Sequence, residues 1–254
     1  MASNESWEAI FRQYTILEHN FDESPFEITS TQIKIATAHF PNTNQKEVRI
    51  LCKQDSREDR PNVFIQNELF LLPKKNGVYQ IIRGEGYINI PPITSQPIIY
   101  NSNLDFSLDT SLVGNSEMQH LDFAYASSLI RTFMNDPSLV LTIRGRKYTP
   151  EFSFNVGNFL IETKSVQTEV DAGYEGRNQV VLIEAKNSTS TNTIIRQLFY
   201  PYKQWSEHTT KDVKCLFFEK QGELYNIWEF IFDDVNNYNS IRLLRSQRYI
   251  INEH

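Results

Sequence analysis

Three charged residues near the middle of the chain have the types and the spacing that metal-assisted hydrolysis needs. Asp171 is separated by twelve positions from Glu184, and Lys186 follows at the end of the apolar run 180–183. A strand places residues i and i+2 on one face, so Glu184 and Lys186 are expected to project together from a strand end. Two carboxylates can hold Mg²⁺, and an ammonium beside them can position or deprotonate a water that attacks a phosphodiester.

The connection between these residues is short enough to bring them together. We expect Gly173 and Gly176 to lie in a loop that returns the chain. Asp171 would then lie on the strand next to Glu184, about 5 Å away. The two carboxylates and the ammonium are therefore predicted to converge at one end of a sheet.

A second set of residues, Glu151, Glu162 and Lys164, has nearly the same spacing and is a rival site. We favour the later set because 180–183 is apolar on both faces, as expected of a central strand covered on both sides. The segment 156–158, Val-Gly-Asn, instead indicates a hairpin turn directly before the rival strand.

The residues before about position 110 are predicted to form an N-terminal α+β lobe. Trp7, Ile10, Phe11 and Tyr14 recur at helical spacing, and a second helix is expected after the cap residues 29–31. Two strands, 63–72 and 78–82, would be joined by a turn containing Asn76-Gly77. Two helices and a hairpin fit a winged-helix-like module that reads DNA, and they fit equally an α+β lobe that makes no DNA contact.

The remaining residues, 111–254, are predicted to form the catalytic domain, with the junction in the proline-rich and asparagine-rich segment 91–115. Helix, strands, helix and strands follow in order, which describes an α+β or α/β fold with a mixed central sheet flanked by helices. The expected helices are 118–135 and 193–208, and the expected strands are 139–143, 152–156, 159–163, 166–171, 180–186, 213–219 and 224–232.

Composition narrows the class of protein. No run approaches the length of a membrane span, so we expect a cytoplasmic protein without a membrane partner. The two cysteines and the five histidines have no metal-ligand spacing. A net charge of -6 argues against bulk coating of nucleic acid, but it leaves room for local basic patches that could contact DNA. The candidate DNA-binding residues are Arg57, Arg60, Lys74, Lys75, Arg144, Arg146 and Lys147.

Residues 115–235 resemble the PD-(D/E)xK nuclease superfamily, and within it the type II restriction endonucleases. The resemblance rests on Asp171, on Glu184-Ala185-Lys186, and on the local sequences 169–176 and 196–202. Val170 stands where the family often has Pro before its first acid. The resemblance implies a Mg²⁺-dependent cut of double-stranded DNA that leaves 5′-phosphate and 3′-hydroxyl ends. It also implies that Asp171 and Glu184 are the metal ligands and that Lys186 lies beside the attacking water.

Four further residues could support such a site. Glu117 opens the helix before the sheet, where the helix dipole already favours an acid. Glu169 shares a strand face with Asp171, Glu175 could be an outer ligand or a turn residue, and Gln197 lies on the helix after the motif strand.

Cutting both strands of a symmetric site would require two active sites, so a homodimer is the simplest expectation. The alternatives are a repair or junction-resolving nuclease with the same core, and a DNA-binding protein whose nuclease-like domain is inert.

Overall fold

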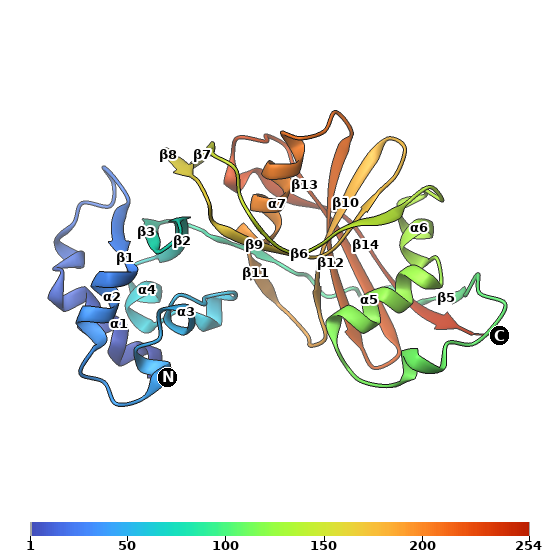
Figure 1. The fold of residues 1–254 in the computed structure, drawn as a ribbon, viewed down its shortest axis with the longest axis horizontal. Coiled ribbons are helices and arrows are strands. Elements are labelled where there is room, and N and C mark those ends of the chain that lie inside the picture. The colour runs from blue at the N-terminus through green and yellow to red at the C-terminus, as the bar shows by residue number, and fades with distance from the viewer. Residues whose placement is uncertain (1, 254) are drawn as a thin grey trace.

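The chain forms a small N-terminal lobe and a larger lobe built on one long sheet, which lie side by side (Figure 1). The computed structural model describes residues 2–253. The fold is mixed α+β with a large mixed sheet flanked by helices, as the sequence predicts. Within residues 2–253, no helix combines the length and the apolarity that crossing a bilayer would require.

The N-terminal lobe packs short helices against a three-stranded sheet of order β1-β3-β2. Its core holds Trp7 and Phe64, whose rings meet edge to face with centroids 4.8 Å apart. The predicted second helix begins at a capping box, in which the Thr29 hydroxyl accepts the N–H of Gln32 and the Gln32 side chain accepts the N–H of Thr29. The elements are α1 (Ala2–Gln13), β1 (Phe26–Thr29), α2 (Ser30–Thr37), α3 (Val48–Leu51), α4 (Asn62–Gln66), β2 (Leu69–Lys75) and β3 (Val78–Arg83).

The strand predicted over 63–72 is wrong in its first half. Residues 62–66 form the helix α4. Glu68 adopts a left-handed backbone conformation, with φ of 55°, between this helix and the start of β2. Short apolar runs fit a buried helix as well as a strand, and here the packing of Phe64 against Trp7 decides the outcome.

The larger lobe contains a seven-stranded sheet of order β5-β14-β13-β12-β10-β9-β6. Its centre pairs β9 antiparallel to β10 and β10 parallel to β12, and α7 forms the crossover between the parallel strands. The strands are β5 (Ile98–Asn101), β6 (Val140–Tyr148), β9 (Gln167–Glu175), β10 (Gln179–Lys186), β12 (Asp212–Gln221), β13 (Leu224–Phe232) and β14 (Ile241–Asn252).

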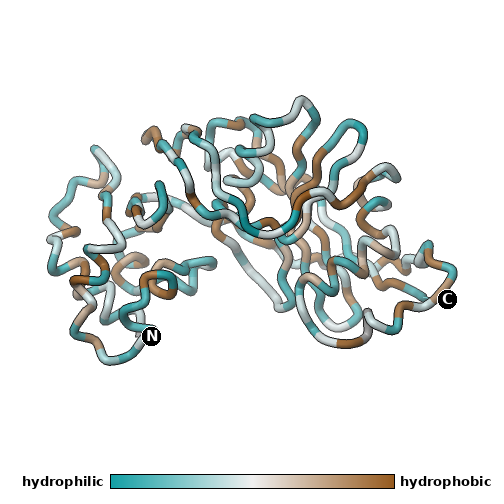
Figure 2. The backbone as a smooth tube through the Cα atoms, viewed as in Figure 1, coloured by the Kyte–Doolittle hydropathy of each residue, from teal (hydrophilic) through white to brown (hydrophobic). Residues whose placement is uncertain are grey.

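Helices cover both faces of this sheet. The side chains of Val181 and Ile183 pack toward α5 (Glu117–Ala126) and α6 (Leu129–Met134). The opposite face lies under α7 (Arg196–Ser206) and the hairpin of β7 (Phe152–Val156) and β8 (Phe159–Thr163). Apolar residues accordingly concentrate along the middle strands (Figure 2).

The larger lobe differs from the prediction in several places. The helix expected over 118–135 is two helices, because Ser128 adopts a φ of 68° between them. The strand β14 lies beyond the last strand that the sequence predicts, 224–232. The predicted junction segment contributes β5, which pairs with β14 at the sheet edge. The domain division at residue 110 stays a prediction.

Contacts from distant parts of the chain join the two lobes. The strands β4 (Tyr87–Asn89) and β11 (Asn192–Ile194) pair antiparallel between them. The hydroxyl of Tyr200, which is fully buried on α7, donates to the carbonyl of Pro73 over 2.9 Å. The strand pair and the hydrogen bond thus fix the two lobes to each other at two points.

The predicted loop around Gly173 is wrong, because this glycine lies within β9 and the return is made by residues 176–178. Gly173 pairs with Leu182 on one side and with Ile143 on the other. A methyl group at this position would lie 2.7 Å from the Cβ of Ile143, closer than side chains pack. Its missing side chain lets β6 approach the strand that carries Asp171.

Gly173→Ala is expected to lower the free energy of unfolding by about 2 kcal/mol, because the Cβ of Ile143 is fixed by its backbone and cannot yield. Urea unfolding measures the change. Gly176→Ala is the control, since its methyl group would meet the end of the Asp136 side chain, which can rotate away at the cost of hydrogen bonds from Ser138 and Gln179, and should cost less. Equal losses in the two variants would contradict this account.

Candidate active site

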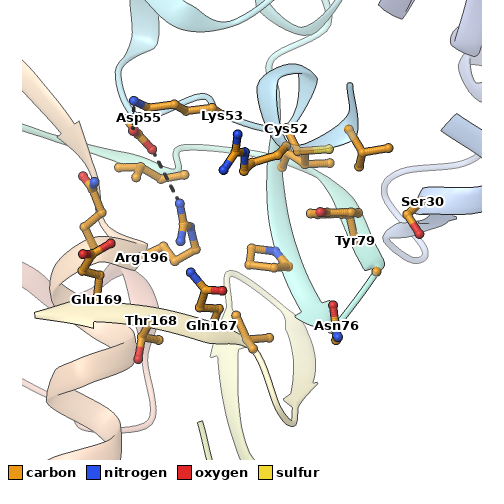
Figure 3. A pocket seen from close by; sticks show the side chains of 18 of the residues that line it. Ser30, Cys52, Lys53, Asp55, Asn76, Tyr79, Gln167, Thr168, Glu169 and Arg196 are labelled. Carbon is orange, nitrogen blue, oxygen red and sulfur yellow. Dashed lines mark ion pairs between the residues drawn. The ribbon is translucent and has the colours of Figure 1, made fainter. Parts of the chain in front are cut away.

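A cleft of about 710 Å³ lies between the two lobes and is lined by residues of both. Figure 3 shows Asp55 and Tyr79 of the N-terminal lobe across from Thr168, Glu169 and Arg196 of the larger lobe. Asp171, Glu184 and Lys186 all line this cleft. A second cavity of about 340 Å³ also reaches Lys186.

The strands β9 and β10 bring the three predicted catalytic residues together. Their pairing runs from Val180–Glu175 to Ile183–Ala172, which places Asp171 and Glu184 at the next position along the two strands. The Asp171 carboxylate accepts the backbone N–H of Ala185 at 2.7 Å. Lys186 Nζ donates to Glu184 Oε1 at 2.5 Å. The three residues therefore lie close together at the end of the central strand, with Lys186 paired to Glu184 and Asp171 bonded to the backbone between them.

Burial dominates the electrostatics of this group. The side chain of Glu184 is only 9% exposed, and burial, opposed by the ammonium of Lys186, raises its pKa to about 7. Burial likewise raises the pKa of Asp171, and the hydrogen bond from Ala185 opposes that rise. Burial by itself would lower the pKa of Lys186, but the Glu184 carboxylate outweighs it and the pKa is raised. At neutral pH the lysine is therefore a cation.

The two carboxylates can accept a divalent cation. Asp171 uses Oδ2 to accept from Ala185, and Glu184 uses Oε1 to accept from Lys186. The second oxygen of each group remains as a hard ligand of the kind that Mg²⁺ prefers, and Mg²⁺ commonly takes one or two carboxylates together with water and substrate phosphate. Residues 2–253 hold no group of three or more His, Cys, Asp or Glu side chains placed to bind a metal.

The structure brings three of the four predicted supporting residues into the cleft. Glu117, Glu169 and Gln197 line it, and the charge of Glu117 acts on both Asp171 and Lys186. Gln197 also lies beside Glu184 in a small cavity under α7 and accepts from the hydroxyl of Thr193 at 2.7 Å. Glu175 lies at the opposite end of β9, where it forms an ion pair with Lys211.

The rival residues lie on the exposed hairpin β7–β8. Lys164 Nζ and a carboxylate oxygen of Glu151 are 2.7 Å apart, and these side chains are 66% and 71% exposed. Glu162 is also exposed. Pairs of this kind are ordinary surface ion pairs, and these three residues are not among those that line the cleft.

The predicted DNA-binding residues separate into two groups. Lys75 lines the cleft, and Lys147 is exposed on the edge strand β6. The others make contacts within the protein: Arg57 with Glu85, Arg60 with the carbonyl of Leu69, Lys74 with Glu27, Arg144 with Asp122 and Arg146 with Glu169.

Sequence reasoning did not find the charged residues with which the N-terminal lobe and α7 line the cleft. These residues are far apart in the chain, and no local pattern distinguishes them from ordinary surface charges. They are Lys34, Glu47, Arg49, Lys53, Asp55 and Arg196.

The raised pKa of Glu184 predicts how stability depends on pH without added metal. The folded state holds this proton more tightly than the unfolded state, so stability is present at low pH and is lost as pH rises from about 4.5 to about 7. Between about pH 5.5 and pH 8 the loss from this group is ~2 kcal/mol. Urea unfolding in EDTA measures the free energy of unfolding as a function of pH. The loss assigned to this group should disappear in Glu184→Gln and persist in Glu162→Gln. An unchanged slope in Glu184→Gln would refute the assignment.

Comparison with known families gives two adjoining matches. Residues 4–81 match a domain of unknown function, DUF6996, and residues 82–250 match a domain of unknown function, DUF6997. Neither curated proteins nor solved structures gave a match. The second match covers more than half of the chain, and the protein therefore belongs to the DUF6997 family.

Proposed function

We propose that the protein is a Mg²⁺-dependent, sequence-specific endonuclease of double-stranded DNA, of the type II restriction enzyme class. The observation that carries the proposal is the convergence of Asp171, Glu184 and Lys186 on one wall of the cleft between the lobes. A buried pair of carboxylates beside a cation is costly unless it is compensated, and a bound metal ion would compensate it.

The topology around these residues supports the PD-(D/E)xK resemblance. The strands β6, β9 and β10 form an antiparallel series, α7 crosses over, and β12 returns parallel to β10. Glu184 and Lys186 then close the central strand of a sheet that helices cover on both faces, which is the setting that the resemblance implies.

The roles of the residues follow from their charges. Asp171 and Glu184 would hold Mg²⁺, which polarises the scissile phosphate and offsets its developing charge. Lys186 stays protonated beside Glu184, so it acts as a hydrogen-bond donor that orients the attacking water and as a positive charge near the phosphate. The products would carry 5′-phosphate and 3′-hydroxyl ends.

The charges of the cleft suit a nucleic acid between the lobes. The wall of the larger lobe carries two basic residues, Lys186 and Arg196, and four acids: Glu117, Glu169, Asp171 and Glu184. On the wall of the N-terminal lobe the basic residues outnumber the acids Glu47 and Asp55; they are Lys34, Arg49, Lys53 and Lys75. A phosphate backbone would meet cations on one side and the metal-binding carboxylates on the other.

The N-terminal lobe would read the DNA. Its element order and its sheet order β1-β3-β2 suit a winged-helix-like module. Residues of α2, of α3 and of the β2–β3 turn line the cleft, so helix and turn could both reach the duplex. We further propose that the protein is cytoplasmic. It would act as a homodimer, because both strands of the duplex must be cut.

Lys186→Ala is expected to reduce the rate of DNA cleavage at least about 100-fold, because the water loses its orienting donor and the phosphate loses a nearby cation. The assay incubates methyl-free genomic DNA with Mg²⁺ and looks for discrete fragments. Lys164→Ala is the matched control, since it removes an exposed lysine outside the cleft.

Cleavage that survives Lys186→Ala would reject the assigned residues. Fragments without discrete ends would indicate a repair or junction-resolving nuclease. Specific DNA binding that Mg²⁺ leaves uncut would indicate an inert nuclease-like domain.

Mg²⁺ should raise the unfolding temperature more at pH 8 than at pH 6, because Glu184 must lose its proton before it can bind the ion. Differential scanning fluorimetry with and without Mg²⁺ measures the shift. Asp171→Asn and Glu184→Gln should each remove it, and Glu175→Gln, at the far end of β9, should keep it. A shift of the same size in all three variants would place the metal elsewhere.

A further inference from the structure

On the basis of the proposed function, we propose that Arg196 binds a phosphate of the DNA backbone, and that Asp55 of the N-terminal lobe occupies this arginine until DNA displaces its carboxylate. The structure thus assigns Asp55 the part of a phosphate mimic within the cleft.

The ion pair between Asp55 and Arg196 spans the cleft and is loose. Arg196 Nη2 and Asp55 Oδ1 are 3.6 Å apart, and Asp55 Oδ2 lies 3.8 Å from Lys53 Nζ. Figure 3 shows the Asp55 carboxylate with dashed lines to both cations. Charge-assisted hydrogen bonds are usually about 2.7–2.9 Å long, so neither cation holds this carboxylate tightly.

The guanidinium of Arg196 has capacity for a further ligand. Its Nε is buried and, among the described residues, has no hydrogen-bond partner. An arginine offers five N–H donors in a planar fork that matches two oxygens of one phosphate. A buried donor without an acceptor is destabilising, and a phosphate oxygen would remove that cost.

The position of Arg196 suits a phosphate close to the scissile one. It is the first residue of α7, an eleven-residue helix whose N-terminus carries partial positive charge. The next residue, Gln197, lies beside Glu184 in the cavity under the helix. Arg196, Glu184 and Lys186 all line the same cleft, so one DNA strand could meet all three.

Displacement of Asp55 requires only its side chain to move. The backbone carbonyl of Asp55 accepts the N–H of Ile194 at 2.8 Å, which fixes its main chain to the larger lobe. A rotation of the side chain would release Arg196 and leave the lobes in place. The Asp55 carboxylate also repels an incoming phosphate, so it should weaken DNA binding.

The test measures binding of a fluorescein-labelled duplex of random sequence by anisotropy in EDTA, so that cleavage plays no part. Asp55→Asn is expected to tighten binding several-fold. Arg196→Gln should weaken it about tenfold and lower the slope of log K against log salt by about 1. In the Arg196→Gln background, Asp55→Asn should raise the affinity for the duplex less than twofold. The single variant Arg196→Lys should retain most of the slope of log K against log salt.

The matched control is the exposed ion pair of Arg242 and Asp233, with atoms 2.8 Å apart on the sheet. Asp233→Asn should not change the effect of Arg242→Gln on binding. Thermal unfolding of each variant verifies that it is folded.

The outcomes test this inference and the nuclease proposal separately, except that a complete loss of binding bears on both. An equal gain from Asp55→Asn in both backgrounds overturns the inference, even if Mg²⁺ produces discrete fragments. Coupling without any cleavage in Mg²⁺ supports the inference and rejects the nuclease. A wild-type protein that does not bind the duplex at low salt overturns both.

Discussion

The burial of the Glu184 carboxylate at the end of the central strand is the constraint on which the rest of the structure depends. Only 9% of this side chain is exposed, and a lone carboxylate in such a place would be strongly destabilised. Lys186 compensates it from two residues along the same face of the strand. The adjacent Asp171 adds like charge, and the hydrogen bond from Ala185 stabilises the Asp171 anion. A fold that retains this arrangement is suited to binding a cation at that point.

The surrounding elements keep this arrangement rigid. Gly173 allows β6 to lie close to β9, and the helices on both faces exclude water from the strand interiors. The N-terminal lobe then closes the open end of the sheet and supplies positive charge that the larger lobe lacks there. A chain with a net charge of -6 can in this way present a basic wall to a polyanion.

The two lobes are also joined by Asp55, which is neither a proposed catalytic residue nor a core residue. Asp55 is fixed by its backbone to Ile194 while its carboxylate lies loosely between two cations. Rigid backbone and loosely held charge are the combination that allows a site to exchange an internal anion for an external one.

The sequence by itself determined the main strands and the central group of residues. An apolar run with Glu184 and Lys186 at its end has a fixed alternation, so their common face needed no tertiary information. The sequence could not distinguish charged residues that are free to bind DNA from those in ion pairs within the protein. Arg57, Lys74 and Arg146 have the same local pattern as Lys75, yet they contact acids of distant segments.

Only the tertiary structure decided which surface faces the site. Residues 62–66 form a helix in which Phe64 packs against Trp7, and β14 joins the sheet although no strand was predicted there. The cleft itself combines α3 and the turn of β2 and β3 with the start of α7, which lies more than a hundred residues further along the chain. Local periodicity fixes which way a side chain points along its own element, whereas the partners of a charge depend on contacts between distant elements, which no short pattern encodes.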